Sequence, residues 1–161
     1  MKVVAVVGTK KTGKTTLVES LVRSLKRYGH VGTIKNMQSH PVDKGDTKRH
    51  FEAGAEEVLG LGKQKIKITR KESLESALLE LNEDGMDFVI VEGFKSSNLP
   101  KIVLGGINVL NTLCHVETPL NETLLKNLTD LIISLEDYNP VNKEKSSEDD
   151  NLEPTLGKSI V

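Results

Sequence analysis

The chain has 161 residues, 37% hydrophobic and 28% charged, which is enough for one domain with an apolar core and excludes a wholly disordered chain. No stretch reaches the roughly 18–20 uncharged apolar residues of a membrane helix, so we expect no membrane span. The single cysteine, Cys114, excludes an internal disulfide and a cysteine-rich metal site. The apolar run before Gly8 is too short for a signal peptide, so we expect a cytoplasmic protein.

The net charge of −1 hides a strong asymmetry. Residues 1–71 contain 16 Lys and Arg against 6 Asp and Glu, a net charge of +10, whereas residues 72–161 contain 6 against 17, a net charge of −11. A basic half is typical of a nucleic-acid-binding surface or of a surface around a phosphorylated ligand. With 2 Tyr, 3 Phe and no Trp, stacking platforms for bases are scarce, so we expect no nucleic-acid partner.

The first half of the chain alternates between strand and helix patterns. Valine-rich Lys2–Val7 predicts a strand buried on both faces, and leucines at helical spacing predict a helix over Lys14–Tyr28. Val31–Lys35 predicts a second strand, and polar residues 36–45 predict an exposed loop. Asp46 can cap a helix that runs to about Val58.

The second half continues the alternation. A capping-box pattern of Thr69 and Glu72 predicts a helix that ends at Asp84, and Asn121 caps a last helix. The apolar runs Ile102–Leu104 and Ile107–Leu110 flank Gly105-Gly106, which indicates a hairpin or a looser connection between them. The strands that these runs predict are Ile66–Thr69, Phe88–Val91, Ile102–Leu104 and Ile107–Leu110.

A phosphate-binding loop connects the first predicted strand to the first predicted helix. Gly8–Thr15 matches G-x-x-x-x-G-K-[ST] at every defined position, and its glycines let backbone N–H groups surround phosphate oxygens. We expect Lys14 to bridge the β- and γ-phosphates, the Thr15 hydroxyl to ligate magnesium (Mg²⁺), and Thr16 to contact the α-phosphate. Lys10 and Lys11 are either solvated charges near the phosphates or direct contacts. The predicted nucleotide-binding residues of the loop are Gly8, Thr9, Lys10, Lys11, Thr12, Gly13, Lys14, Thr15 and Thr16.

An acidic residue ends a later apolar strand, as this class of nucleotide-binding proteins requires. Phe88–Val91 leads into Glu92, which we expect to hold a Mg²⁺-bound water or polarise the attacking water, with Gly93 leaving room for a γ-phosphate. Glu92 and Lys14 are therefore the candidate catalytic residues. The fold class predicted is α/β, a P-loop NTPase three-layer sandwich with a largely parallel sheet. It covers residues 1–138, and the polar residues 139–161 are expected to form a mobile or loosely packed tail.

Several separated segments resemble the molybdopterin-guanine dinucleotide biosynthesis protein B family, MobB. They span residues 2 to about 104 and add two clusters to the phosphate loop. These segments are Gly8–Leu17, Ile34-Lys35 with His40 downstream, Asp43 through Gly45-Asp46-Thr47 to Arg49, Ala53-Gly54-Ala55, Val91-Glu92-Gly93-Phe94-Lys95 and Pro100-Lys101-Ile102. The chain departs from the family pattern at Asn36, where histidine is common, and at Thr47, where serine is common.

The resemblance implies GTP binding with at most slow hydrolysis, a homodimer, and the guanylyltransferase MobA as partner. By position it assigns Asp46, with Thr15 and Glu92, to the metal and its water, and Arg49 and Lys95 to the anion site. The guanine-reading motif N/T-K-x-D is absent, so the GTP assignment depends on the resemblance alone.

Two other functions remain open at this stage. A small ATP-dependent nucleoside or metabolite kinase uses the same loop, but it needs an acceptor pocket and usually lid arginines, and no clustered lid segment is present. A nonenzymatic adaptor would use the nucleotide only to set its shape and would dock partners on its acidic second half. For Cys114 we expect a small core residue and not a nucleophile.

Overall fold

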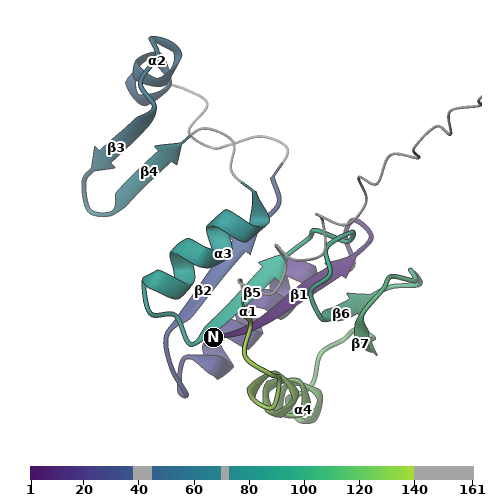
Figure 1. The fold of residues 1–161 in the computed structure, drawn as a ribbon. Coiled ribbons are helices and arrows are strands. Elements are labelled where there is room, and N and C mark those ends of the chain that lie inside the picture. The colour runs from purple at the N-terminus through teal and green to yellow at the C-terminus, as the bar shows by residue number, and fades with distance from the viewer. Residues whose placement is uncertain (38–44, 70–72, 140–161) are drawn as a thin grey trace, which may run out of the picture.

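The computed structural model describes residues 1–37, 45–69 and 73–139 of the chain. Its main body is a five-stranded sheet in the order β2-β5-β1-β6-β7, and each neighbouring pair of strands is parallel. Helices α1 (Lys14–Leu25) and α4 (Glu122–Ile133) lie on one face and α3 (Leu74–Glu83) lies on the other (Figure 1). The predicted three-layer α/β sandwich is confirmed. The strands are β1 (Lys2–Gly8), β2 (Val31–Lys35), β5 (Phe88–Glu92), β6 (Lys101–Leu104) and β7 (Thr112–Val116).

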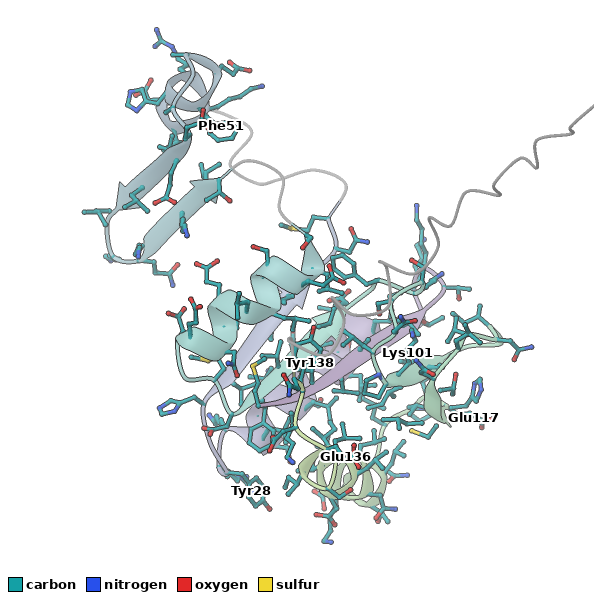
Figure 2. The ribbon with its side chains drawn as sticks, in the orientation of Figure 1. Tyr28, Phe51, Lys101, Glu117, Glu136 and Tyr138 are labelled. Carbon is teal, nitrogen blue, oxygen red and sulfur yellow. The ribbon has the colours of Figure 1, made fainter. Side chains whose placement is uncertain are left out.

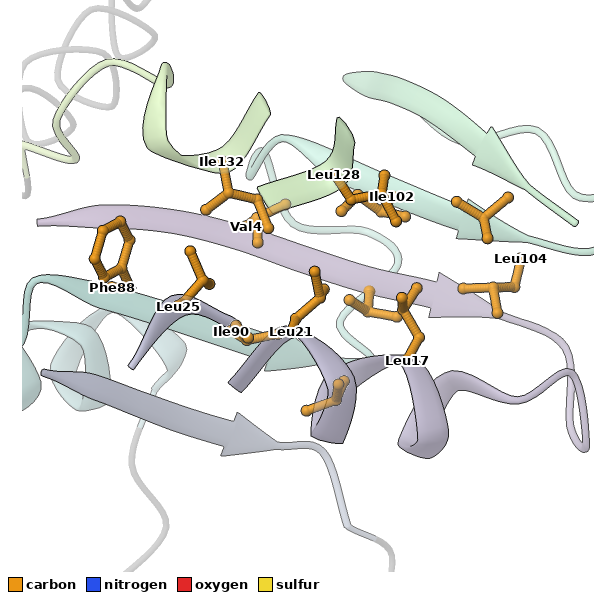
Figure 3. Close-up of a cluster of buried hydrophobic side chains, with 13 residues drawn as sticks. Val4, Leu17, Leu21, Leu25, Phe88, Ile90, Ile102, Leu104, Leu128 and Ile132 are labelled. Atoms are coloured by element: carbon orange, nitrogen blue, oxygen red, sulfur yellow. The ribbon is translucent and has the colours of Figure 1, made fainter. Parts of the chain in front are cut away.

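The central strand β1 is buried on both faces, which explains its run of valines. Val3–Val7 are at most 3% exposed. Because side chains alternate along a strand, Val4 and Val6 pack with α1 and α4 (Figure 3), whereas Val3, Ala5 and Val7 pack with α3. Strand β1 thus contributes side chains to both apolar cores, and both helix layers pack against it.

Helix α1 is shorter at its C-terminus than the apolar pattern predicts. It ends at Leu25, and Tyr28 N–H donates to the Leu25 carbonyl in a turn. Gly29 then passes so close to Asp87 that a Cβ atom there would lie 2.3 Å from the Asp87 carboxylate. The same carboxylate accepts a hydrogen bond from the His30 N–H at 2.7 Å. This close approach turns the chain toward β2 before a further helical turn can form.

The predicted helix from Asp46 to Val58 is wrong in its second half. Helix α2 covers only Asp46–Glu52, and Gly54, with a φ of 110°, lies beyond its end in a conformation that favours glycine. Val58 belongs instead to β3 (Glu57–Leu61), which pairs antiparallel with β4 (Lys65–Thr69) in a separate two-stranded sheet. Pairing with β4, which follows β3 after residues 62–64, overrode the helical signal.

Two further boundaries differ from the sequence prediction. Thr69 lies in β4, and α3 begins after Ser73, whose hydroxyl accepts a hydrogen bond from the Ser76 N–H at 3.0 Å. Ile107–Leu110 is not a strand, because Ile107 and Val109 turn into the apolar core on the α3 face. The strand beside β6 is β7, which sequence reasoning missed and which runs parallel to β6.

The predicted cap of the last helix is confirmed, since the Asn121 side chain accepts from the Leu124 N–H at 2.8 Å. No helix within the described residues is long and apolar enough to cross a membrane. The division between a domain over residues 1–138 and a tail over residues 139–161 stays a prediction, because residues 140–161 lie outside the described ranges.

Candidate functional site

The phosphate loop follows β1 at the carboxyl edge of the parallel sheet. In open α/β sheets this edge forms the ligand crevice, at the strand where the chain switches from one side of the sheet to the other. That strand is β1, with β5 on one side and β6 on the other. Gly8 is required because a Cβ atom there would lie 2.5 Å from the Leu104 carbonyl oxygen of β6. The loop therefore starts in close contact with a neighbouring strand.

The second glycine of the motif shapes the start of α1. Gly13 has a φ of 86°, in the left-handed region, and is the N-cap residue of the helix. It provides no side chain to cap the first N–H groups, and the first turn of α1 contains no acidic residue. The uncapped N–H groups and the helix dipole therefore favour an anion at this point.

Lysine and threonine side chains surround the turn itself. The Lys14 ammonium donates to the Thr9 carbonyl oxygen, so its side chain folds back over the loop. The Thr12 hydroxyl donates to the same carbonyl at 3.0 Å. Thr9, Lys10, Lys11, Thr15 and Thr16 are exposed. The loop is thus internally braced while several of its polar side chains remain accessible to a ligand.

Glu92 ends β5 directly beside the phosphate loop. The register of the sheet places it opposite Val6 of β1, and the Gly93 N–H donates to the Val6 carbonyl at 3.0 Å. The Thr15 hydroxyl donates to Glu92 Oε1 at 3.1 Å, and Lys35 Nζ lies 3.5 Å from Glu92 Oε2. Two predicted site residues that are 77 positions apart are therefore in direct contact.

The contact between Thr15 and Glu92 brings together the kinds of oxygen that Mg²⁺ accepts. Protein sites for Mg²⁺ commonly supply one or two such oxygens and leave the remaining positions to water and substrate phosphates. Within the described ranges, no group of three His, Cys, Asp or Glu side chains could hold a metal ion by itself. The donor set therefore fits a Mg²⁺ ion that is held jointly with a phosphate, and it does not fit an all-protein metal cage.

An open pocket of about 850 Å³ adjoins Glu92, between the ends of β2 and β5. Three predicted nucleotide-site residues, Lys10, Gly93 and Lys95, are among its walls. Gly93 has a φ of 100°, and a Cβ atom there would lie 3.0 Å from the Asn36 Cβ, so glycine keeps the two strand ends close together. The lining residues are Lys10, Lys35, Asn36, Met37, Gly93, Phe94, Lys95 and Ser96.

The structure does not bring Asp46 and Arg49 to the phosphate loop. Both lie on α2, where their side chains are 85% and 80% exposed and form an ion pair with each other at 3.5 Å. Figure 1 shows α2 and the β3–β4 hairpin apart from the five-stranded sheet. The contribution of these two residues to the site stays a prediction.

On the opposite side of β1, two further loops approach the phosphate loop. A Cβ atom at Gly105 would lie 3.3 Å from Thr12 Cγ2, and one at Gly13 would lie 3.5 Å from Thr118 Cγ2. The connections that follow β6 and β7 therefore flank the loop on the side away from the pocket. Neither contact was visible in the sequence, because they join segments about 90–105 residues apart.

Lys101 is a structural element of the site that sequence reasoning did not single out for a role. It is fully buried at the start of β6 (Figure 2), and its ammonium donates to the carbonyls of Ser97, Leu99 and Leu110, the latter two at 3.0 Å. It thereby ties the loop after β5 to the loop after β6. A lysine inside the apolar run from Leu99 to Leu104 was the available signal.

Cys114 is half-buried on β7, and burial raises the pKa of its thiol. A raised pKa lowers the fraction of reactive thiolate at neutral pH. The interpretation of Cys114 as a packing residue therefore agrees with its surroundings, since it packs against the core on the α1 and α4 face.

Comparison with known proteins gives consistent similarities. The family model for molybdopterin guanine dinucleotide synthesis protein B matches residues 3–130. A Haemophilus influenzae molybdopterin-guanine dinucleotide biosynthesis adapter protein is 34% identical over 62% of this chain and 60% of its own length. A Methanocaldococcus jannaschii protein that carries the same name provisionally is 38% identical over 65% of this chain and 47% of its own. The chain thus spans less than two thirds of either relative.

A solved structure supports the fold. The crystal structure of a MobB protein homolog from Bacillus stearothermophilus superposes with a TM-score of 0.65. The superposition covers 84% of this chain and all of the other, at 24% sequence identity. At 24% identity the similarity shows that the two chains share a fold, and it does not extend to the details of the site.

We predict that Lys101→Met destabilises the protein by about 3 kcal/mol, because three buried or partly buried carbonyl groups lose a charged donor. Chemical denaturation monitored by circular dichroism measures the change. Lys95→Met, at an exposed position in the same region, is the control and should leave the unfolding free energy within about 0.5 kcal/mol. Equal stability of the two variants would show that the Lys101 ammonium is not needed to hold the loops.

Proposed function

The chain belongs to the molybdopterin guanine dinucleotide synthesis protein B family, MobB, and on that premise we propose that it is a GTP-binding adapter of molybdenum cofactor biosynthesis. The observation that carries the proposal is the contact between Thr15 and Glu92 at the N-terminus of α1. Phosphate-binding loop, metal-binding hydroxyl and acidic strand end are then parts of one site. The names of the relatives supply the pathway.

In this proposal the phosphates of GTP lie along the loop. N–H groups of the loop and of the first turn of α1 bind the phosphate oxygens, and Lys14 exchanges its contact with the Thr9 carbonyl for the β- and γ-phosphates. Thr16 contacts the α-phosphate. Lys10 and Lys11 supply positive charge around the γ-phosphate end.

Thr15 and Glu92 would hold Mg²⁺, which when bound neutralises charge on the β- and γ-phosphates. Glu92 would also orient the attacking water, since its carboxylate lies next to the loop and is only 14% exposed. Lys35 Nζ lies 3.5 Å from Glu92 Oε2 and forms an ion pair with that carboxylate. Asp46 and Arg49 would contribute to the metal and anion sites only if α2 lay closer to the phosphate loop than it does in the structure.

Slow hydrolysis follows from the charges around the pocket. Its lining contains lysines and no arginine. Arg23 lies within α1, facing Glu19, and Arg49 pairs with Asp46. An arginine that contacts the transferring phosphate accelerates hydrolysis roughly 10³–10⁵-fold in related enzymes. The described residues offer none in that place, which supports binding with weak turnover over a kinase.

Calorimetric titration with GTP, ATP and their nonhydrolysable analogues, with and without Mg²⁺, tests the proposal. We expect Mg²⁺-dependent preference for GTP and a roughly hundredfold loss of affinity in Lys14→Ala, because the triphosphate loses its main cation. Lys26→Ala, at the opposite end of α1, is the matched control. Preference for ATP would favour the kinase hypothesis, and undiminished affinity in Lys14→Ala would remove the loop from the site.

We predict that Glu92→Gln slows GTP hydrolysis roughly a hundredfold while it changes GTP affinity much less, because the amide cannot activate water. Phosphate release under single-turnover conditions measures the first effect and calorimetry the second. Glu19→Gln, on the surface of α1, is the control. Turnover equal to that of the unsubstituted protein would exclude Glu92 from the hydrolysis step.

We further propose that the chain forms a homodimer through β3 and that the GTP-bound form contacts MobA. Among the described strands β3 pairs only with β4, and an isolated two-stranded hairpin is marginal in water. Leu59 and Leu61 of β3 are 50% and 82% exposed. Antiparallel pairing of β3 with β3 of a second copy would satisfy its edge and cover both leucines.

We predict that Leu61→Glu shifts the protein from dimer to monomer, because a charged side chain would replace apolar surface that the pairing covers in each copy. Sedimentation velocity at several concentrations measures the change. The same experiment with MobA added measures whether MobA binds to the chain. Leu110→Glu, which is 79% exposed away from the hairpin, serves as control. A dimer that persists in Leu61→Glu would place the interface elsewhere.

A further inference from the structure

The pocket beside Glu92 is larger than the end of a triphosphate requires. Only Lys10 belongs to the phosphate loop, and the other walls come from the end of β2 and from the segments that follow β2 and β5. A volume of about 850 Å³ lies in the range of pockets that hold a whole small molecule. The space therefore extends past the γ-phosphate position, on the side away from the loops at Gly105 and Thr118.

The walls combine positive charge with apolar surface. Within the described residues, Lys10 and Lys95 form no ion pair, and Lys35 has only Glu92 as a partner. Met37 is 42% exposed, although a methionine more often lies in a core. Phe94 supplies an aromatic side chain. A ligand that suits these walls carries an anionic group for the lysines and a flat ring for Met37 and Phe94.

Phe94 is held in a strained conformation at this pocket. Its φ of 56° lies in the left-handed region, which is a rare conformation for an aromatic residue. Such strain costs about 1–3 kcal/mol and persists only where the surroundings impose it. Here the Ser97 N–H donates to the Phe94 carbonyl at 3.0 Å, and Lys101 binds the Ser97 and Leu99 carbonyls. The fully buried lysine thus holds the segment that carries Phe94 and Lys95 into the pocket wall.

We propose that this pocket binds a second ligand beside the nucleotide, a small molecule with a phosphate monoester attached to a flat conjugated ring. The inference rests on the proposed function, because a dinucleotide joins two phosphorylated halves, so the pterin half must carry its own phosphate before it meets a guanine nucleotide. Lys95 binds the phosphate, and Met37 and Phe94 contact the ring. The adapter would then hold both halves of the dinucleotide at one edge of its sheet.

Fluorescence anisotropy with neopterin monophosphate as probe tests the inference, in the presence of saturating nonhydrolysable GTP analogue and Mg²⁺. We expect saturable binding, at least tenfold weaker for neopterin without its phosphate. Lys95→Met should weaken binding at least tenfold through loss of charge, and Met37→Asp through repulsion of the phosphate and loss of ring contact. Lys26→Met, which removes the same charge at the far end of α1, should bind the probe unchanged.

Titration of the GTP analogue into the same variants separates loss of the pocket from loss of the fold. Competition between probe and GTP analogue, with both lost in Lys14→Ala, would overturn the inference and make the pocket a part of the nucleotide site. Absence of probe binding while the GTP analogue binds would overturn the inference and leave the proposed function intact. Absence of binding by both would count against both proposals.

Discussion

β1 and β5 run parallel with Val6 opposite Glu92, and this register determines where the phosphate loop and the acidic strand end meet. The register is secured because Val3–Val7 are buried on both faces between α3 on one side and α1 and α4 on the other. A slip by one residue would exchange the side chains of the two cores. The contact between Thr15 and Glu92 is therefore a consequence of packing far from the site itself.

The loops at the carboxyl edge are joined to one another as well as to the strands. Gly8 touches the end of β6, Gly105 lies against Thr12, and Lys101 binds carbonyls from two connections. These contacts make the edge of the sheet a rigid support for polar side chains, as a site that recognises phosphate by geometry requires. The glycines allow the backbone segments to approach closely, and the buried Lys101 ammonium donates to three carbonyl groups.

Positive charge is concentrated where an anionic ligand would lie. The basic first half of the chain supplies Lys10, Lys14 and Lys35, and the second half adds Lys95, one of its few lysines. Glu92 is the acidic residue among them, paired with Lys35. Part of the positive charge of the basic half is thus gathered at this edge of the sheet.

The hairpin of β3 and β4 shows why local patterns failed where they did. Residues 53–58 carried a helical signal that pairing with β4 overrode, and the β7 strand was hidden because its apolar residues alternate between burial and exposure. The start of α3 was misplaced because Thr69 was needed in a strand, which left Ser73 as the cap. In these cases strand pairing and capping decided which of two local patterns the chain adopts.

By itself, the sequence determined the parallel α/β fold, the phosphate loop and the acidic strand end, because each depends on short-range signals: glycine geometry, a buried valine run and helical periodicity. Only the tertiary structure decided that Thr15 touches Glu92, that Asp46 and Arg49 lie on α2 apart from the five-stranded sheet, and that a pocket opens beside Lys95. These features depend on strand order and register, which bring together residues 77 positions apart through the burial of side chains elsewhere in the sheet.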